Sequence, residues 1–340
     1  MRVAVVGCGL IGARRATVAR DAGDEVRAVV DLDPARARDL AAQVSARPLT
    51  DWREAVADPE VDAVCVSTVN AALMPVTLGA LAAGKHVLCE KPFGRNAAEA
   101  AEMTRAAREA GRTVKVGFNL RFHPGIADAH RLARSGALGR LAHLRAAYGH
   151  GGRPGYEHEW RGDPALAGGG ELLDQGVHLV DLTRWFLGDI GRVYGVTSTV
   201  AWPIAPLEDN GFALLHARSG AVASLHTSWT QWRNLFRLEL FGDRASVAVE
   251  GLGGSYGDER LTLHTRRPEG GRPDEEVRTY PPEDASWAEE WREFRAAVTE
   301  GRPPLGAAED GLAVARIVDG IYASARTGTP VEIAAEGARA

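Results

Sequence analysis

The chain has 340 residues, of which 45% are hydrophobic and 25% are charged, and its formal net charge is −5. This length suggests two domains, and the composition excludes a disordered chain, a fibrous chain and a small fold held together by disulfides. Acidic and basic residues are interspersed without long runs, so no nucleic-acid partner is expected.

Cysteine usage and the N-terminus indicate a cytoplasmic protein. The three cysteines, Cys8, Cys65 and Cys89, have no metal-ligand spacing and are expected to be reduced thiols. The first residues lack the apolar segment of a secretion signal, and no run is long enough to cross a membrane, so we expect no membrane association. Only three of the 40 basic residues are lysines, namely Lys85, Lys91 and Lys115. Because arginine is so strongly preferred elsewhere, each lysine is a candidate for a position that needs an amine, although an ordinary structural role fits Lys85 and Lys115 well.

Residues 1–120 alternate short apolar segments with helical ones. Strands are predicted at 3–6, 26–30, 61–67, 86–89 and 113–117, and helices at 11–22, 35–44, 74–83 and 97–110. This alternation predicts a doubly wound parallel sheet of the α/β class, the Rossmann architecture, as a first domain.

Residues 121–340 follow another pattern. Helices are predicted at 126–134 and 171–187, and strands at 141–148, 193–200, 211–217, 222–230, 235–241 and 260–265. Tight turns between consecutive strands favour a large, open, mostly antiparallel sheet. Residues 269–276 are expected to form a solvated hairpin loop. Two helices close the chain, from residue 286 and over about 308–326, and the second is a candidate to pack back on the first domain.

A glycine-rich turn follows the first strand directly. Gly7, Gly9 and Gly12 have the G-x-G-x-x-G spacing between a strand and a helix, and Asp31 ends the second strand. The glycines let the backbone approach a pyrophosphate at the helix N-terminus. Asp31 is suited to bind both ribose hydroxyls of NAD and to repel the additional phosphate of NADP, so NAD is favoured. Arg36 is an argument for NADP, because its guanidinium could pair with that additional phosphate.

Four motifs carry a resemblance to a known family. They are Gly7-Cys8-Gly9-Leu10-Ile11-Gly12, then 83–92 (AGKHVLCEKP), then 119–124 (NLRFHP), and then 168–181 (GGGELLDQGVHLVD). In order and spacing they resemble the glucose–fructose oxidoreductase/inositol dehydrogenase (Gfo/Idh/MocA) family over essentially the whole chain. The resemblance implies an N-terminal Rossmann domain (1–120), a C-terminal α/β domain with a large open sheet (121–340), and NAD(P)-dependent oxidation or reduction of a sugar, cyclitol or related polyol.

The resemblance and the residue chemistry together nominate Lys91, Asp174 and His178 as catalytic residues. Asp174 and His178 are four residues apart on one predicted helix and therefore share a face. His178 is the expected general base, since the reference pKa of histidine is about 6.5. Lys91 follows a buried parallel strand, where an ammonium could stabilise a developing alkoxide, so no metal is required.

Further contacts are predicted around these residues. The expected cofactor contacts are Gly7, Cys8, Gly9, Leu10, Ile11, Gly12, Asp31, Leu32, Ser67, Thr68, Asn70, Glu90, Lys91 and Asn119. The expected substrate contacts are Lys91, Arg121, His123, Tyr156, His158, Trp160, Arg161, Asp174 and His178. Trp229, Trp232 and Arg233 fit either the same pocket or a cluster on a sheet face. The chain departs from the family pattern at 68–73 (TVNAAL), where Thr-Pro-Asn and a later histidine are usual, so the cofactor pocket is altered there.

The leading prediction is an NAD-dependent dehydrogenase that interconverts a secondary hydroxyl and a ketone. An NAD-dependent glycosidase of the same fold and a non-catalytic NAD-binding regulator stay open as alternatives. The resemblance also implies a homodimer or homotetramer formed through the C-terminal sheet.

Overall fold

The structure is a computed structural model that describes residues 1–334. The chain forms two compact units. The first comprises Met1–Phe118, Ala165–Gly168 and Trp287–Ala315, and the second comprises Asn119–Pro164, Gly169–Ser286 and the chain from Arg316 onward. A domain boundary at residue 120 stays a prediction.

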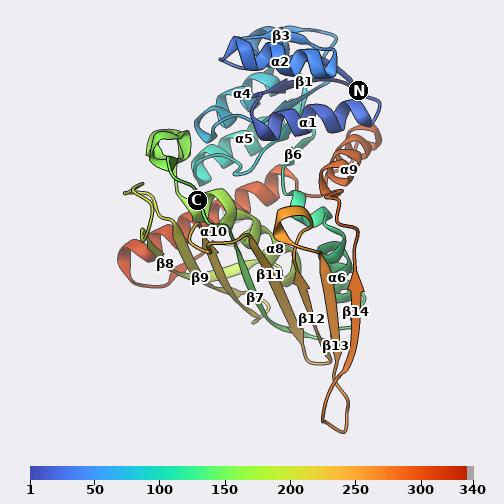
Figure 1. Cartoon of the computed structure of the whole chain (residues 1–340), viewed down its shortest axis with the longest axis vertical. Coiled ribbons are helices and arrows are strands. Elements are labelled where there is room, and N and C mark those ends of the chain that lie inside the picture. The colour runs from blue at the N-terminus through green and yellow to red at the C-terminus, as the bar shows by residue number, and fades with distance from the viewer. Residues whose placement is uncertain (335–340) are drawn as a thin grey trace. The chain divides into compact units, whose positions relative to one another are not determined.

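The first unit is built on a six-stranded sheet. Its strands run in the order β3-β2-β1-β4-β5-β6 and all pair in parallel. The strands are β1 (Arg2–Val6), β2 (Glu25–Val30), β3 (Arg47–Leu49), β4 (Ala63–Val66), β5 (His86–Cys89) and β6 (Val114–Val116). The helices packed around this sheet (Figure 1) are α1 (Leu10–Asp21), α2 (Pro34–Val44), α3 (Trp52–Ala57), α4 (Asn70–Ala82) and α5 (Ala97–Ala110). The predicted Rossmann architecture is confirmed.

Two details of this unit differ from the sequence expectation. Strand β3 and helix α3 were not predicted, because each is too short for hydrophobic periodicity to reveal it. Helix α4 begins at Asn70 rather than near Met74, with Pro75 inside the helix. Proline is favoured in the first turn of a helix, so Pro75 by itself indicates a later start than the structure has.

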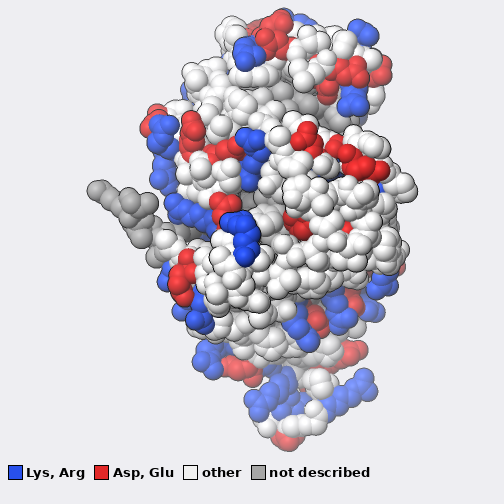
Figure 2. All heavy atoms as spheres, turned by 90° about the vertical axis from the view of Figure 1, so that its left-hand side faces the viewer, with Lys and Arg blue, Asp and Glu red and all other residues white. Residues whose placement is uncertain are grey.

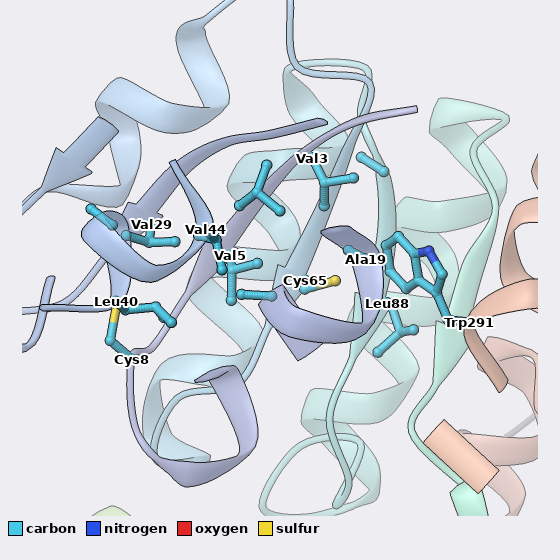
Figure 3. Packing of buried hydrophobic residues seen from close by; sticks show 14 of the residues in the cluster. Val3, Val5, Cys8, Ala19, Val29, Leu40, Val44, Cys65, Leu88 and Trp291 are labelled. Carbon is cyan, nitrogen blue, oxygen red and sulfur yellow. The ribbon is translucent and has the colours of Figure 1, made fainter. Parts of the chain in front are cut away.

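Helix α9 (Ser286–Glu300) adds a C-terminal segment to the core of the first unit. Trp291 and Phe294 are fully buried in one cluster with Val3, Val5 and Leu88 from the sheet. Figure 3 shows Trp291 beside Leu88. The Trp291 indole N–H donates to Asp24 at 2.8 Å, so burial does not leave it unsatisfied. These aromatic side chains secure the helix to the sheet mainly by removing apolar surface from water.

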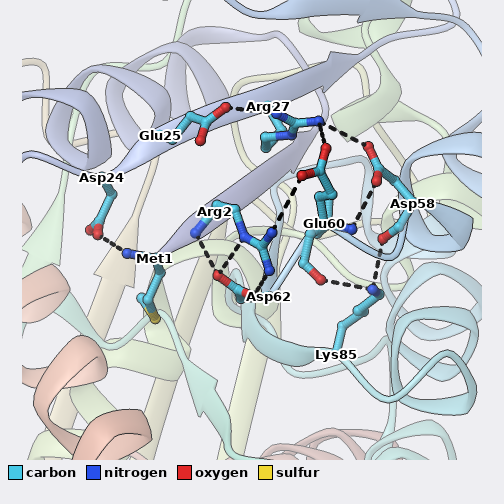
Figure 4. Close-up of polar contacts among 10 residues, drawn as sticks. Met1, Arg2, Asp24, Glu25, Arg27, Asp58, Glu60, Asp62 and Lys85 are labelled. Carbon is cyan, nitrogen blue, oxygen red and sulfur yellow. Dashed lines mark hydrogen bonds and ion pairs between the residues drawn. The ribbon is translucent and has the colours of Figure 1, made fainter.

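Two of the three lysines have structural tasks in this unit. The Lys85 ammonium donates to the main-chain carbonyls of Asp58 and Val61 at 2.8 and 2.7 Å, and Figure 4 shows it beside the charged groups at the start of β1. Lys115 is completely buried, donates to the carbonyl of Leu305 and lies 3.3 Å from a Glu293 carboxylate oxygen. The rarity of lysine therefore points to function at Lys91 alone.

The second unit is built on a nine-stranded mixed sheet. The strand order is β14-β13-β12-β11-β7-β10-β9-β8-β15, and among the described residues only β7 and β10 pair in parallel. The strands are β7 (Leu141–Gly149), β8 (Ile190–Ser198), β9 (Asn210–Ala217), β10 (Val222–Ser228), β11 (Leu235–Gly242), β12 (Ala245–Glu250), β13 (Arg260–Thr265), β14 (Asp274–Thr279) and β15 (Val331–Glu332). The predicted fold class, a parallel Rossmann sheet followed by a large, mostly antiparallel sheet, is confirmed.

Strands β12 and β14 correct the sequence expectation. Alternate residues of β12 are buried, and this strand pairs with both β11 and β13. The stretch expected to be a solvated loop ends inside β14, which begins at Asp274. The strand was missed because its residues are almost all polar and exposed, as is common at the edge of a sheet.

Helices cover one face of the second sheet. α6 (Pro124–Arg134) packs on β12 and β13, and α8 (Val177–Leu187) packs on β7 and β10. The later part of α10 (Ala308–Thr327) packs on β8, where Ile321 meets Gly195. The other helical segments are the short α7 (Pro164–Ala167) and the 3₁₀ turns η1 (Asn119–Phe122), η2 (Tyr156–His158), η3 (Trp160–Gly162) and η5 (Gly254–Tyr256). Most of α7 and the start of α10 belong to the first unit. The segment η4 (Leu172–Gly176), which leads into α8, is a π-helical turn.

Charged side chains of both signs are interspersed over the face shown in Figure 2. Within residues 1–334, no helix combines the length and the apolar character that a membrane span requires.

Candidate functional site

A glycine cradle lies at the end of β1 in the first unit. Gly7 has φ +97°, and a Cβ atom there would lie 2.3 Å from the carbonyl oxygen of Ser67. A Cβ atom on Gly12 would lie 1.7 Å from the carbonyl oxygen of Gly7. Gly9 is the N-cap of α1 (Leu10–Asp21), and it has no side chain that could cap the helix amides. The turn thus has the backbone approach and the positive helix end that a pyrophosphate needs, and NAD fits these residues.

Asp31 lies beside this cradle, at the end of β2. One carboxylate oxygen accepts from the main-chain N–H of Cys8 at 2.8 Å, and the other accepts from that of Asp33 at 2.9 Å. A carboxylate has about four acceptor positions, so two hydroxyl groups can still bind. Burial, followed by the charge of Asp31, raises the pKa of Cys8 to about 12, so this thiol is neutral. Arg36 pairs instead with Asp33 at 3.6 Å.

Other predicted cofactor contacts already have hydrogen-bond partners within the protein. The Asn70 amide donates to the carbonyl of Ala167 at 2.8 Å, and the Asn119 amide donates to the Ser286 hydroxyl at 3.1 Å. Thr68 donates to the carbonyl of Val69 at 3.1 Å. Ser67 differs, because its hydroxyl oxygen is buried and has no hydrogen-bond partner within residues 1–334. Ser67 is therefore the most available of these side chains, while the others stay predictions.

Lys91 follows β5, and the residue before it belongs to a buried charge network. Glu90 accepts from the Arg15 guanidinium at 2.8 Å, and a second group of the same arginine lies 2.6 Å from Glu290. Arg15 is fully buried. Although burial opposes the charge, the two carboxylates hold the pKa of Arg15 above its usual value. The network fixes the end of β5, and therefore the backbone from which Lys91 extends.

Asp174 and His178 lie in the second unit on one continuous helical segment. Asp174 is in the π-helical turn η4, and His178 is in the first turn of α8. Both are buried, with 9% and 5% of their surface exposed. π-helical turns are rare and occur often at functional sites, where they change the direction of a side chain. The Arg161 guanidinium donates to Asp174 at 3.0 Å.

The start of this segment is held by Glu208, a residue that no local sequence pattern identifies. Its carboxylate accepts from the main-chain N–H groups of Gly170 and Leu172 at 3.2 and 3.0 Å, and from the Tyr322 hydroxyl at 2.7 Å. Burial raises the pKa of Glu208. A Cβ atom on Gly170 would lie 2.0 Å from the Glu208 carbonyl oxygen, which explains the third glycine of the motif.

Aromatic residues surround Arg161 in the second unit. The buried Tyr156 ring lies 4.9 Å from that of Trp229, and burial raises the pKa of Tyr156 to about 12. Arg161 stacks over Trp160 at 4.5 Å. The structure thus brings four of the predicted substrate residues, Tyr156, Trp160, Arg161 and Asp174, into one neighbourhood. Trp229 is buried, and its indole N–H has no hydrogen-bond partner within residues 1–334.

Three other predicted substrate residues lie in different surroundings. Arg121 is buried and donates to Asp181 at 2.8 Å, and it lies over the Trp185 ring at 5.5 Å. His123 is buried, with its Nδ1 3.1 Å from Glu259. The side chain of His158 is largely exposed. Arg121 and His123 therefore have partners that account for them without a substrate.

Both parts of the chain are similar to known oxidoreductases. Residues 1–118 match the model of an oxidoreductase family with an NAD-binding Rossmann fold, and residues 126–248 match the GFO/IDH/MocA C-terminal domain. Inositol 2-dehydrogenase 2 of Saccharopolyspora erythraea is 31% identical over 99% of this chain and 97% of its own length. The chain is a member of the Gfo/Idh/MocA family.

Two further relatives of this Gfo/Idh/MocA protein extend the comparison. The 1,5-anhydro-D-fructose reductase of Ensifer adhaerens is 32% identical over 95% of this chain and 94% of its own length. The crystal structure of GenD2 from gentamicin A biosynthesis, in complex with NAD, superimposes with a TM-score of 0.85 at 30% identity, covering 98% of this chain and 97% of that one. The predicted family, enzyme class and NAD cofactor are confirmed: the chain is an NAD-binding oxidoreductase that acts on CH–OH groups.

Proposed function

We propose that the protein oxidises a secondary hydroxyl group of a sugar or cyclitol to a ketone, with His178 as the general base. When bound, NAD accepts a hydride at C4 of its nicotinamide ring. The single observation that carries the proposal is the buried Asp174–His178 pair on a π-distorted helix, in a chain whose first unit has the cofactor cradle.

His178 removes the hydroxyl proton as the carbinol carbon loses its hydride. Histidine suits this step because its ordinary pKa is near neutrality, where both protonation states are accessible. Asp174 accepts a hydrogen bond from the same substrate besides the one it receives from Arg161. In the reductive direction His178 returns the proton to the ketone oxygen.

Lys91 stabilises the negative charge that develops on the reacting oxygen. An ammonium can donate up to three hydrogen bonds, so it can serve the substrate oxygen and a ribose hydroxyl together. The Arg15–Glu90–Glu290 network fixes the backbone that presents it. We assign Lys91 to the electrostatic part of catalysis and His178 to proton transfer.

The test is absorbance at 340 nm with purified protein, NAD or NADP, and myo-inositol, levoglucosan, D-xylose, D-apiose, sugar acids and sugar phosphates. We expect net NADH formation with one or more of the neutral polyols. Release of a leaving group without net NADH would support a glycosidase instead. Binding of NAD with no reaction in either direction, with keto sugars included, would support a regulator.

Asp31 is proposed to set the preference for NAD over NADP. We expect Asp31→Ser to weaken NADH binding about 10- to 100-fold, since hydrogen bonds to a charged group contribute about 1.5–3 kcal/mol each. The ratio of the Kd for NADPH to the Kd for NADH should also fall, because the variant lacks the carboxylate that repels the 2′-phosphate. Quenching of tryptophan fluorescence by each nucleotide measures both effects.

The matched control for this change is Asp58→Ser. The Asp58 carboxylate accepts from the main-chain N–H of Glu60 at 2.9 Å, as Asp31 accepts from that of Asp33, but it precedes β4 at the other end of the sheet. Its nucleotide affinities should equal those of the wild type. An unchanged NADH to NADPH ratio in Asp31→Ser would refute the assignment.

The outer face of the large sheet is proposed to join two or four copies of the chain. Tyr194 and Val196 on β8 and Phe212 and Leu214 on β9 are exposed apolar side chains on neighbouring strands, and Leu214 is 50% exposed. Apolar side chains clustered in this way favour an interface.

We expect Leu214→Arg to shift the protein toward monomers in size-exclusion chromatography with light scattering, because a charge would then be buried in the interface. Ala57→Arg, at an exposed position of α3 in the first unit, is the control and should leave the mass unchanged. A wild type that is monomeric at micromolar concentration would contradict the proposal.

A further inference from the structure

A second glycine-rich segment, residues 251–257, carries Tyr256. This tyrosine lies in the second unit, near the aromatic ring that packs against His178 of α8. The segment joins β12 to β13, and its four glycines all have positive φ, which permits a tight path that other residues resist. The Tyr256 ring lies 5.4 Å from the ring of Tyr148 on β7. The Tyr148 ring in turn meets that of His178 nearly edge-on, at 6.1 Å.

Tyr256 shares hydrogen bonds with two neighbouring side chains. Its phenol oxygen is hydrogen-bonded to the Tyr148 hydroxyl and to the side chain of Gln175. The amide oxygen of Gln175 has no hydrogen-bond partner within residues 1–334, so Gln175 donates through its amide N–H and Tyr256 accepts. The two phenols carry two protons and share one hydrogen bond, so one O–H proton stays available for a third group. Tyr256 lies next to Gln175, and we assign that proton to Tyr256.

Both tyrosines are neutral at physiological pH. Burial is the main reason that the pKa of Tyr148 lies well above its usual value, and burial likewise raises the pKa of Tyr256. The negative charges of Glu171 and Asp174 act in the same direction on each phenol. Tyr256 is therefore a donor throughout the working range of the enzyme.

Gln175 provides the matching acceptor. It lies in η4 directly after Asp174, and its side-chain amide is hydrogen-bonded to the Tyr256 hydroxyl. Its amide oxygen is buried and has no hydrogen-bond partner within residues 1–334. A buried carbonyl oxygen without a hydrogen bond lowers the stability of the protein. A ligand hydroxyl that donates to this oxygen would remove that cost. The Tyr256 hydroxyl can therefore donate, and the Gln175 amide oxygen can accept. The two side chains are hydrogen-bonded to each other, and Tyr148 connects them to the His178 ring.

We propose that Tyr256 and Gln175 together bind one substrate hydroxyl, on a carbon next to the one that is oxidised, so that the enzyme selects vicinal diols. A hydroxyl both donates and accepts, and this pair supplies one partner for each role. Tyr148 is a positioning residue, since it orients Tyr256 and packs against the His178 ring. The inference rests on the proposed function, because it takes Asp174 and His178 as the place of the reacting hydroxyl.

The experiment compares a substrate with its analogue that lacks the neighbouring hydroxyl. The parent is whichever of myo-inositol, levoglucosan, D-xylose and D-apiose the wild type oxidises fastest. We expect the wild type to prefer the parent by about tenfold or more in kcat/KM, mainly through KM. In Tyr256→Phe this ratio should fall close to 1, with the pH profile of kcat unchanged. Gln175→Met, which removes the acceptor, should have the same effect.

Tyr280→Phe is the matched control. The Tyr280 hydroxyl donates to Asp128 at 2.8 Å, so the same substitution there should keep the wild-type ratio. Calorimetric titration of the NADH-saturated proteins with parent and analogue gives the ratio of Kd values without turnover. Full discrimination in Tyr256→Phe, or equal losses for parent and analogue, would overturn the inference. Failure of the proposed function is a separate result, namely no NADH from the wild type with any parent, and the calorimetric ratio then still decides the role of Tyr256.

Discussion

Replacing His178 with glutamine should lower kcat/KM about 10²- to 10⁴-fold, the range in which a positioned general base contributes. The loss should appear in kcat, because proton removal occurs in the chemical step while Asp174 still binds the substrate. Glutamine preserves hydrogen bonding and approximate size in this buried position, where only 5% of the histidine surface is exposed. Initial rates of NADH formation measure the effect.

Two comparisons make this result specific to proton transfer. His264→Gln, on β13, should keep wild-type activity, because that imidazole lies 3.3 Å from the half-exposed Glu275 on the next strand. NADH binding to the His178 variant, measured by fluorescence, should equal that of the wild type. A variant that retains more than a tenth of the wild-type kcat would remove His178 from the role of general base.

Replacing Arg121 with methionine should destabilise the protein by about 3–5 kcal/mol, the range for breaking a buried ion pair. The substitution leaves the Asp181 carboxylate buried beside an apolar side chain, where its charge is no longer compensated. Urea unfolding followed by tryptophan fluorescence measures the loss. The KM of the substrate should change by less than threefold, since the guanidinium is already engaged by Asp181.

The double variant Arg121→Met with Asp181→Leu is the informative control. It removes both charges and fills similar volume, so most of the lost stability should return. An unchanged unfolding midpoint together with a tenfold rise in KM for Arg121→Met would restore the interpretation of Arg121 as a substrate residue.

The sequence alone predicts those parts of the fold that have strong local signals. The cradle glycines and Asp31 are recognisable because strand, turn and helix follow one another directly, and buried strands such as β1 and β5 are short, apolar and clearly bounded. Strand β14 has almost no apolar residues, and only its pairing with β13 identifies it. Local pattern cannot reveal an element that is defined by its neighbour.

In the candidate site, too, some residues are predictable from local sequence and others are brought together only by the fold. Asp174 and His178 are evident from their spacing, but the π-helical turn that carries Asp174 is not, because it depends on how the segment packs. Glu208 reaches Gly170 and Leu172 from a distant loop, and Tyr256 reaches Tyr148 from another strand. Arg121 is predicted from the sequence as a substrate contact, and its partner Asp181 is too remote in sequence for the pairing to be foreseen. The one local signal that could have identified Tyr256 is its position among four glycines.

The most direct measurement of the central claim is isotope transfer from a polyol that carries deuterium on the carbon to be oxidised. After reaction with unlabelled NAD, mass spectrometry should find one deuterium in each NADH formed, with an equal amount of ketone product. That result would establish direct transfer from the carbinol carbon to the nicotinamide. NADH without deuterium, or deuterium returned to a product that has lost a leaving group while NAD stays unchanged, would contradict the assignment as a dehydrogenase.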